Sequence, residues 1–377
     1  MANFFSTLLS SFDKKGRSAL GIDIGSSSIK LVQLRKQGAR AILETYGELA
    51  LGPYAGIEVG RATNLSQDKI IEALKDLVKE ANVTTRDSGF SIPAGASLLS
   101  FIRMPYADDR QLRTMIPIEA RKYIPVPISE VSLDWWVIPK EEETASDFDM
   151  PKDTSRPTTP EPRMIDVLLV VIHNETLARM NQIVTGSGMN SSFFEIEIFS
   201  SMRSVVEQTL DPVMIFDMGA ASTKLYIIER GILRSAHTVN RGSQDITLAI
   251  SRALNMTVID AEHAKRAIGI TTDAEHKNMG DIITLTLEYI FSETGRAILN
   301  YQKRYNKNIS RIVLTGGGSL LKGLLEAART RFQTEIVLAD PFSKTVTPAF
   351  IEATLRAAGP EFAVAIGIAL RKLQKIE

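Results

Sequence analysis

One short pattern occurs twice in this chain and constrains its fold more than any other feature. Residues 23–31 read Asp-Ile-Gly-Ser-Ser-Ser-Ile-Lys-Leu, and residues 217–225 read Asp-Met-Gly-Ala-Ala-Ser-Thr-Lys-Leu. In each copy the Asp ends an apolar run, the Gly lies in a short turn, and the Leu opens the next apolar run. Two copies 194 positions apart (217 − 23) predict two related domains, each built on a strand, a tight loop and a second strand.

The chemistry of these loops favours phosphate. A glycine lets the backbone approach an anion closely, and successive amide groups with nearby hydroxyls form a concave anion site. The predicted phosphate contacts are Gly25, Ser26, Ser27, Ser28, Gly219, Ala220 and Ser222. Asp23 and Asp217 carry the same charge as phosphate, so we expect them to hold the water shell of a bridging Mg²⁺. One such loop alone is more often an ordinary hairpin turn, and the second copy reverses that preference.

A third glycine-rich loop supports a nucleotide ligand. Residues 312–319 read Ile-Val-Leu-Thr-Gly-Gly-Gly-Ser, and a helix is predicted over 320–330. A plain strand-to-helix turn needs only one glycine. Three of them, followed by a helix N-terminus, suit an α-phosphate or a nucleoside. Gly316, Gly317 and Gly318 are therefore predicted to contact nucleotide.

The remaining pattern suggests an interrupted first domain and a continuous second one. The first domain is predicted over 18–93 and 191–212, and the second over 213–377 with a mainly helical part at 243–305. Between them, 94–190 reads as an inserted α+β module. Its elements are predicted as a strand at 98–103, a helical stretch at 108–123 interrupted at Pro117, strands at 132–138 and 165–172, and a helix at 174–185.

Two segments stand apart from this plan. Residues 139–163 hold five prolines and seven acidic residues, which predicts a solvated, flexible loop. Residues 1–17 begin with an apolar stripe at helical spacing, followed by basic residues. That segment could contact a membrane surface or a partner, or it could pack on its own domain.

Composition excludes several other functions. The chain has no cysteine, so disulfides and thiolate metal sites are excluded. Its formal net charge is zero, which gives no support to a nucleic-acid partner. The four histidines lack the spacing of a zinc hydrolase. No run approaches the roughly 20 apolar residues that span a bilayer, and no basic leader precedes the first apolar residues, so we expect a cytoplasmic protein.

These motifs resemble the actin-like ATPase superfamily. Residues 21–30 look like its phosphate-1 motif, 215–223 like phosphate-2, 312–319 like the adenosine motif, 195–200 like connect-1 and 362–367 like connect-2. The resemblance implies an α/β, actin-like (duplicated ribonuclease H-like) two-domain ATPase fold, with an inserted small α+β subdomain of the FtsA/PilM type. It also implies small residues in connect-2 that let two helices cross closely.

The same resemblance assigns further roles. ATP or ADP with Mg²⁺ is the implied ligand, and Lys30 would contact the β and γ phosphates. Glu262 and Lys265 would face the ribose and base, and Glu197 would position water. Lys224 matches Lys30 in the repeat, but the superfamily generally uses only the first lysine, so Lys224 is assigned a structural role.

The position of the insertion, the opening residues and the segment 113–128 are similar to the PilM family of type IV pilus assembly. The chain stops directly after connect-2, which disfavours the FtsA family. The resemblance implies a nucleotide-responsive scaffold with slow or partner-dependent hydrolysis, recruited to the inner face of the inner membrane. Its implied partners are the N-terminal cytoplasmic tail of a PilN-like membrane protein and other pilus motor components. The tail would lie in a groove lined by Arg103, Leu112, Arg113 and Ile116.

Two alternatives remain open from the sequence. One is an FtsA-like filament-forming division scaffold. The other is a small-molecule kinase, which would need an aspartate beside the substrate hydroxyl. The available aspartates, Asp134 and Asp166, fall on predicted strands of the insertion.

Overall fold

The computed structural model describes residues 18–139, 164–207 and 209–375. The predicted amphipathic segment 1–17 and nearly all of the predicted loop 139–163 lie outside these residues. The chain divides into two compact units, one of residues 1–93 and 182–377 and the other of residues 94–181.

The first unit contains two five-stranded sheets of the same plan. In the first sheet the order is β3-β2-β1-β4-β8, from β1 (Ser18–Ile24), β2 (Ser28–Gln37), β3 (Arg40–Ala50), β4 (Asp87–Ile92) and β8 (Asn190–Ile196). The first three strands are antiparallel neighbours, whereas β4 runs parallel to both β1 and β8.

The second sheet repeats this order as β11-β10-β9-β12-β13. Its strands are β9 (Val213–Met218), β10 (Thr223–Glu229), β11 (Ile232–Val239), β12 (Arg311–Thr315) and β13 (Glu335–Leu338). The registers also correspond, because Asp23 pairs with Lys30 in one hairpin and Asp217 pairs with Lys224 in the other. The predicted duplication is thus present at the level of strand order and register. We call the first sheet with its helices the first half, and the second sheet with its helices the second half.

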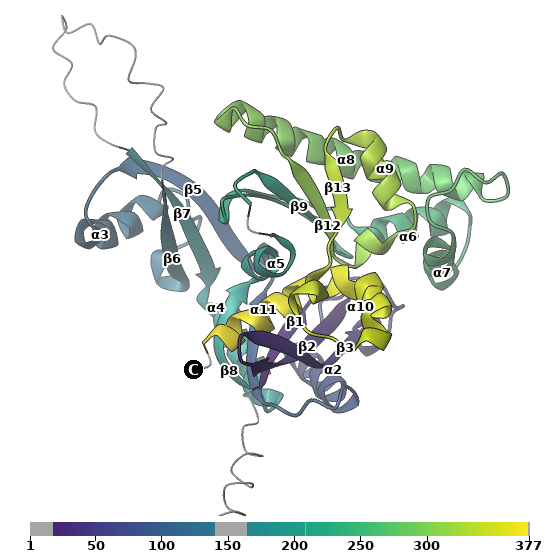
Figure 1. The fold of residues 1–377 in the computed structure, drawn as a ribbon, viewed down its shortest axis with the longest axis horizontal. Helices are drawn as coiled ribbons and strands as arrows, with labels where there is room; N and C mark the ends of the chain where they lie inside the picture. Colours follow the sequence, from purple (N-terminus) through teal and green to yellow (C-terminus); the bar gives the residue numbers. More distant parts are fainter. Residues whose placement is uncertain (1–17, 140–163, 208, 376–377) are drawn as a thin grey trace, which may run out of the picture. The chain divides into compact units, whose positions relative to one another are not determined.

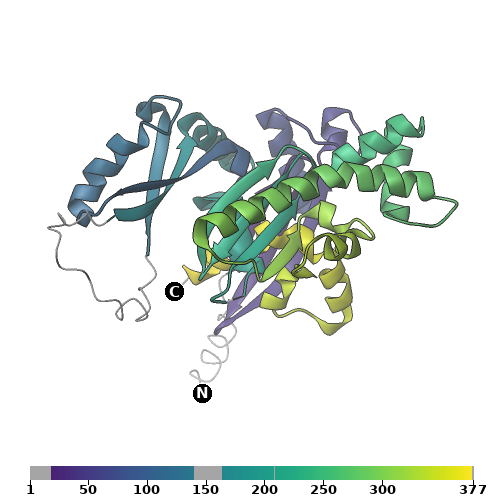
Figure 2. The same cartoon turned by 90° about the horizontal axis from the view of Figure 1, so that it is seen from above.

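The helices follow this division. The first half carries α2 (Gln67–Glu80), α5 (Glu197–Val205), α10 (Glu352–Ala358) and α11 (Ala363–Gln374), and the second half carries α6 (Ser243–Ala253), α7 (Val258–Ile268), α8 (Lys277–Tyr305) and α9 (Leu324–Arg331) (Figure 1). The 29-residue helix α8 runs along the second sheet, as Figure 2 shows. Its buried face, which includes Ile283, Leu287 and Ile290, packs with Met214 and Phe216 of β9 in one apolar core.

The backbone of helix α11 lies very close to the backbones of two other segments. A Cβ built on Gly21 of β1 would lie 2.0 Å from the carbonyl oxygen of Ala365, and one on Gly367 would lie 2.0 Å from the carbonyl oxygen of Ser200 in α5. Only glycine fits at such an approach. The expected close crossing of small residues is therefore present.

The segment Ala349–Gln374 is long and apolar enough, by composition, to cross a membrane. About 61% of its most apolar window is buried within the molecule. Phe362, Ala365, Ile366 and Ala369 of this segment lie in a core with residues of β1 and β2. Its apolar character is accounted for by this packing.

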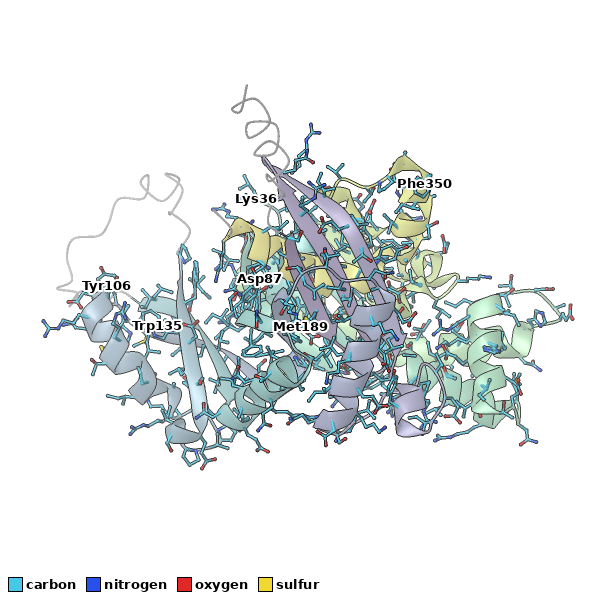
Figure 3. All side chains as sticks on the ribbon, turned by 90° about the horizontal axis from the view of Figure 1, so that it is seen from below. Lys36, Asp87, Tyr106, Trp135, Met189 and Phe350 are labelled. Atoms are coloured by element: carbon cyan, nitrogen blue, oxygen red, sulfur yellow. The ribbon has the colours of Figure 1, made fainter. Side chains whose placement is uncertain are left out.

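The second unit is a three-stranded antiparallel sheet with one packed helix. The order is β5-β7-β6, from β5 (Ser97–Pro105), β6 (Val131–Ile138) and β7 (Met164–His173). Helix α3 (Asp109–Ala120) covers one face of this sheet, and α4 (Asn174–Gly186) begins in this unit and ends in the first one. Tyr106, which follows β5, and Trp135 of β6 belong to this unit and are labelled in Figure 3. The unit ends at Asn181, whereas the predicted insertion extended to residue 190.

Helix α3 corrects one prediction. The sequence predicted an interruption at Pro117, but the helix continues through this residue to Ala120. Leu112, Ile116 and Ala120 lie four residues apart on one face and are all buried in the core of the unit. Their burial offsets the loss of one backbone hydrogen bond at the proline.

Candidate functional site

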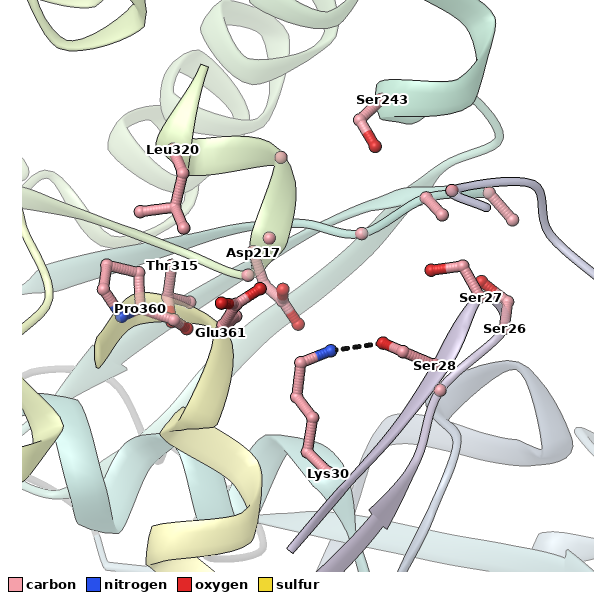
Figure 4. A pocket seen from close by; sticks show the side chains of 18 of the residues that line it. Ser26, Ser27, Ser28, Lys30, Asp217, Ser243, Thr315, Leu320, Pro360 and Glu361 are labelled. Carbon is pink, nitrogen blue, oxygen red and sulfur yellow. Dashed lines mark hydrogen bonds between the residues drawn. The ribbon is translucent and has the colours of Figure 1, made fainter. Parts of the chain in front are cut away.

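A cleft of about 440 Å³ lies within the first unit, where the turns of both halves meet. In Figure 4, Ser26, Ser27 and Ser28 of one turn face Asp217, Thr315 and Glu361 across this space. The structure brings together here every residue that the sequence assigned to phosphate, magnesium, nucleoside or catalysis. They are Asp23, Gly25, Ser26, Ser27, Ser28, Lys30, Glu197, Asp217, Gly219, Ala220, Ser222, Glu262, Lys265, Gly316, Gly317 and Gly318.

The two turns have the same hydrogen-bonded form. The amide of Gly25 donates to the carbonyl oxygen of Ser28 at 3.0 Å, and the amide of Gly219 donates to that of Ser222 at 2.9 Å. A Cβ on either glycine would lie within 3.2 Å of the accepting oxygen. This explains why both turns carry glycine at the position after the aspartate strand.

The carbonyl groups of the first turn are held by a neighbouring loop. The amides of Thr63 and Leu51 donate to the carbonyl oxygens of Ser26 and Ser27, each at 2.8 Å. Within the described part of the chain, the amides of Ser26 and Ser27 donate to no backbone carbonyl group. The turn therefore presents donors rather than acceptors to the cleft.

The carbonyl groups of the second turn are also bonded by a neighbouring segment. The amides of Ser243 and Gln244, which begin α6, donate to the carbonyl oxygens of Gly219 and Ala220 at 2.9 and 3.1 Å. A Cβ on Gly242 would lie 2.4 Å from the carbonyl oxygen of Ala220, so this approach requires glycine. Two opposed turns whose carbonyls are already bonded form a site suited to anions.

Lys30 places a positive charge beside the first turn. Its Nζ donates to Ser28 Oγ at 2.6 Å, as Figure 4 shows, and lies 3.1 Å from Glu48 Oε1. Burial alone would raise the pKa of Glu48. The charge of Lys30 and the hydrogen bonds that Glu48 accepts outweigh burial and lower that pKa. The side chain of Lys30 is thus fixed at the cleft by two partners.

The carboxylates of Asp23, Glu197 and Asp217, of which Asp23 is half-buried and the other two are buried, influence one another in the cleft. Burial, reinforced by Glu197, raises the pKa of Asp23, although Ser91 Oγ donates to its Oδ1 at 2.6 Å. Burial also raises the pKa of Asp217 to about 6, with Lys224 opposing the shift and Glu197 and Asp23 reinforcing it. The mutual repulsion of these carboxylates favours a positively charged group beside them.

Lys224, which the sequence assigned a structural role, also lines the cleft. Its Nζ donates to Glu197 Oε2 at 2.9 Å and lies 3.8 Å from Asp217 Oδ2. Its match to Lys30 in the repeat was the available signal. The sequence also missed Glu48, Ser201 and Glu361, which line the same cleft.

The predicted nucleoside contacts form a compact network on the second half. Lys265 Nζ lies 2.7 Å from Glu262 Oε2 and donates to Thr247 Oγ1 at 2.9 Å. Arg266 Nε lies 2.7 Å from the other Glu262 oxygen. A Cβ on Gly60 of the first half would lie 3.0 Å from the Glu262 carboxylate, so the two halves approach each other closely here.

The third glycine loop lies against Asp217 but lacks the predicted helix end. Gly316 has φ +81°, and a Cβ on it would lie 2.4 Å from Asp217 Oδ1. A helix was predicted from residue 320, but Gly317–Leu320 form a short 3₁₀ turn and α9 begins at Leu324. Gly323, at φ +81°, separates the turn from the helix. The loop therefore lets another group approach its backbone closely, but it is not followed directly by a helix N-terminus.

The predicted partner groove is only half accessible. Arg103 and Arg113 are exposed on β5 and α3. Leu112 and Ile116 are 3% and 0% exposed and belong to the core of the second unit. These two residues are therefore not surface contacts, because they form the helix face that packs on the sheet.

Comparison with known protein families and proteins relates this sequence to a family and to a more distant relative. A family model described as "Type IV pilus assembly protein PilM" matches residues 21–373. The cell division protein FtsA of Rhizobium meliloti (strain 1021) is 27% identical over 180 residues. That alignment covers 40% of this chain and 38% of the FtsA protein, so the chain matches little more than a third of that relative's length.

Solved structures share the fold over almost the whole chain. The structure titled "PilM-PilN type IV pilus biogenesis complex" has a TM-score of 0.77 at 24% identity and covers 94% of this chain and 98% of its own. MreB5 of Spiroplasma citri bound to ADP has a TM-score of 0.52 at 9% identity, covering 93% and 94%. The ethanolamine utilization protein EutJ of Carboxydothermus hydrogenoformans has a TM-score of 0.54 at 13% identity, covering 94% and 89%. The expected actin-like fold is confirmed.

Proposed function

Because the chain belongs to the type IV pilus assembly protein PilM family, we propose that it is a nucleotide-binding scaffold on the cytoplasmic side of a pilus assembly complex. The observation that carries the nucleotide proposal is the pair of opposed turns. The carbonyl groups of both turns are bonded by neighbouring segments, both turns line one cleft, and each follows a strand whose second-to-last residue is an aspartate.

The parts of the cleft suit the parts of a nucleotide. The two turns and Lys30 would hold the phosphates, because amide donors and an ammonium group favour anions. The loop 316–318 permits close approach of the nucleoside, and Glu262 with Lys265 would contact the ribose and base. ATP and ADP are the proposed ligands, and the ADP in the MreB5 structure belongs to a protein of the same fold.

The carboxylates fit a hydrated magnesium ion. In the described ranges no group of three or more His, Cys, Asp or Glu side chains is arranged to hold a metal ion directly. Asp23 and Asp217 would instead accept hydrogen bonds from water molecules of the ion's shell. Mg²⁺ would neutralise part of the phosphate charge beside these carboxylates.

Hydrolysis, where it occurs, would depend on Glu197. This carboxylate begins α5 and lines the cleft, so it is the group placed to orient a water molecule or accept its proton. We propose slow or partner-dependent turnover. No observation favours the kinase alternative, since Asp134 and Asp166 lie on β6 and β7 of the second unit.

We propose a PilN-like membrane protein as partner, because one solved structure that shares the fold, with a TM-score of 0.77, is a PilM–PilN type IV pilus biogenesis complex. Such a partner would recruit the chain from the cytoplasm to the inner face of the inner membrane. Arg113 and Arg103 are the exposed residues of the predicted groove. Arg113→Ala should weaken capture of a tail peptide, and Arg179→Ala, an exposed arginine of α4, is the control.

The experiment that tests the nucleotide site is equilibrium binding of a fluorescent ATP analogue with Mg²⁺. Asp23→Ala and Asp217→Ala should each weaken binding at least about tenfold, because each removes a charge-assisted interaction worth roughly 1.5–3 kcal/mol. Asp211→Ala removes an exposed carboxylate just before β9 and is the matched control. Unchanged affinity in both cleft variants would refute the site. Rapid phosphorylation of an added sugar would favour the kinase.

A further inference from the structure

An ion pair joins the two halves at the floor of the cleft. Glu197 is the first residue of α5 in the first half, and Lys224 is the second residue of β10 in the second half. Lys224 Nζ donates to Glu197 Oε2 at 2.9 Å. Both side chains are largely buried, with 17% and 9% of their surfaces exposed, so water screens the pair only weakly.

The ammonium group of Lys224 stays charged in this setting. Burial alone would lower the pKa of Lys224, but the carboxylates of Glu197 and Asp217 outweigh burial and raise it well above its ordinary value. Lys224 Nζ occupies Glu197 Oε2, so this oxygen is not available to a water molecule while the ion pair is intact.

A second polar group beside Glu197 lacks a partner. Ser201 lies one helical turn further along α5, lines the same cleft and is fully buried. Among the described residues no group hydrogen-bonds to its Oγ. A buried hydroxyl without a partner is destabilising, and a water molecule or a phosphate oxygen in the cleft would supply one.

We propose that Lys224 restrains Glu197, so that nucleotide hydrolysis is slow while this ion pair is intact. The inference rests on the proposed nucleotide site. In the restrained reaction, the oxygen of water bonds to the γ-phosphorus and the bond to the bridging oxygen breaks. The bridging electron pair stays with the diphosphate, and the proton of water passes to the carboxylate of Glu197. Ser201 Oγ is placed to hold that water.

The restraint has a built-in release. Asp217 lies on the same half as Lys224 and pairs with it across β9 and β10, with Oδ2 3.8 Å from Nζ. Glu197 lies on the other half. A small rotation of the halves would separate Lys224 from Glu197 and leave it with Asp217. Turnover would then follow movement of the halves, which a bound partner can bias.

The test compares four variants of the full chain with wild type. Lys224→Met removes the ammonium and keeps the length of the side chain. Glu197→Gln and the double variant remove the proton acceptor. Lys307→Met removes a partly buried lysine–glutamate pair, to Glu229 in the second half and outside the cleft lining, and controls for stability. Binding of a fluorescent ATP analogue, melting temperature and single-turnover hydrolysis between pH 6 and pH 9 are measured for each.

Lys224→Met should accelerate single-turnover hydrolysis at least about tenfold, within the range that general bases supply, while ATP affinity changes less than about threefold. Glu197→Gln and the double variant should not show this acceleration. If Lys224→Met does not fold, Lys224→Gln should show the same acceleration, since it keeps a hydrogen-bond donor without the charge.

Equal or slower hydrolysis by Lys224→Met with ATP still bound would overturn the restraint, and so would acceleration that persists in the double variant. Either result leaves the nucleotide site standing. Failure of wild type to bind ATP would overturn the proposed function and this inference with it.

Discussion

The backbone amide of Ala62 donates to Gln244 Oε1 at 3.0 Å and so ties a loop of the first half to helix α6 of the second. The same loop, residues 51–66, also bonds the carbonyls of Ser26 and Ser27 through Leu51 and Thr63. Gln244 in turn donates its own amide to Ala220 of the second turn. Gln244 therefore connects the segments that support both turns, one through its side chain and the other through its backbone amide.

Removing this tie should speed nucleotide release. In Gln244→Ala the two halves lose a hydrogen bond across the cleft, so the dissociation rate of a fluorescent ATP analogue should rise several-fold. The free energy of unfolding should fall by only about 1 kcal/mol. Gln302→Ala, which removes the hydrogen bond to Asn308 at the end of α8, is the control. An unchanged dissociation rate would show that the tie does not limit release.

Adjacent glycines should respond differently to alanine. Gly316 has φ +81° and would bring a Cβ within 2.4 Å of Asp217 Oδ1, whereas a Cβ on Gly317 would meet Glu361 Oε2 at 3.4 Å, an ordinary contact. Gly316→Ala should lower the free energy of unfolding by at least about 2 kcal/mol and weaken ATP binding. Gly317→Ala should leave stability within about 1 kcal/mol. Equal stability of the two variants in urea unfolding would contradict this reading of the loop.

The buried charge of Asp217 should make the nucleotide-free protein less stable at neutral pH. Burial raises its pKa from 3.8 to about 6. The proton is held more tightly in the folded state, so the contribution of this group is fully present below about pH 4 and is lost as the pH rises through about 6. Asp217→Asn, a neutral residue of the same shape, should therefore raise the free energy of unfolding at pH 7 by up to about 3 kcal/mol.

That gain should disappear near pH 4, where the wild-type carboxyl is also protonated. Chemical unfolding in the presence of a chelator, at pH 4 and pH 7, measures both effects. Asp211→Asn, at an exposed carboxylate, should change stability at neither pH. A variant that is less stable than wild type at pH 7 would show that the Asp217 charge is stabilising, against the expected sign.

Glu195 should carry much of the stability of the first half. Its side chain is 4% exposed and receives Arg203 at 2.8 Å and Arg371 of α11 at 2.6 Å. Burial opposes its ionisation, but the two arginines and Ser200 lower its pKa, so its contribution is present at neutral pH and is lost as the pH falls below about 4.5.

Glu195→Gln leaves two arginines without their shared partner and should cost about 3–5 kcal/mol in urea unfolding. Glu335→Gln breaks the exposed pair with Arg311 and should cost less than about 1 kcal/mol. Similar losses in the two variants would mean that burial does not strengthen the Glu195 network.

Local signals in the sequence were sufficient for much of the fold. The aspartate, glycine and lysine of each hairpin are set by strand alternation and turn geometry, so the duplication and the cleft that it forms could be predicted. The start of α9 could not, because the 3₁₀ turn before it depends on how Gly316 and Gly318 pack against residues 217 and 218. The continuity of α3 through Pro117 likewise depends on burial against a sheet whose strands lie on both sides of it in the sequence.

The role of Lys224 was hidden for a related reason. The repeat placed it opposite Asp217, but only the tertiary structure brings Glu197 to its Nζ. The same limit applies to Leu112 and Ile116. An apolar residue on a helix suits a core and a binding groove equally well, and only the position of the sheet decides between them.

The fit of α11 against Gly21 and Ser200 has a consequence for how the chain is made. Gly21 and Ala365, which touch through their backbones, are 344 positions apart (365 − 21). The second half, whose core spans Met214 to Ile336, is complete when the ribosome has not yet reached α11. The apolar face of the strands at the start of the chain can therefore be covered only after α11 has been synthesised.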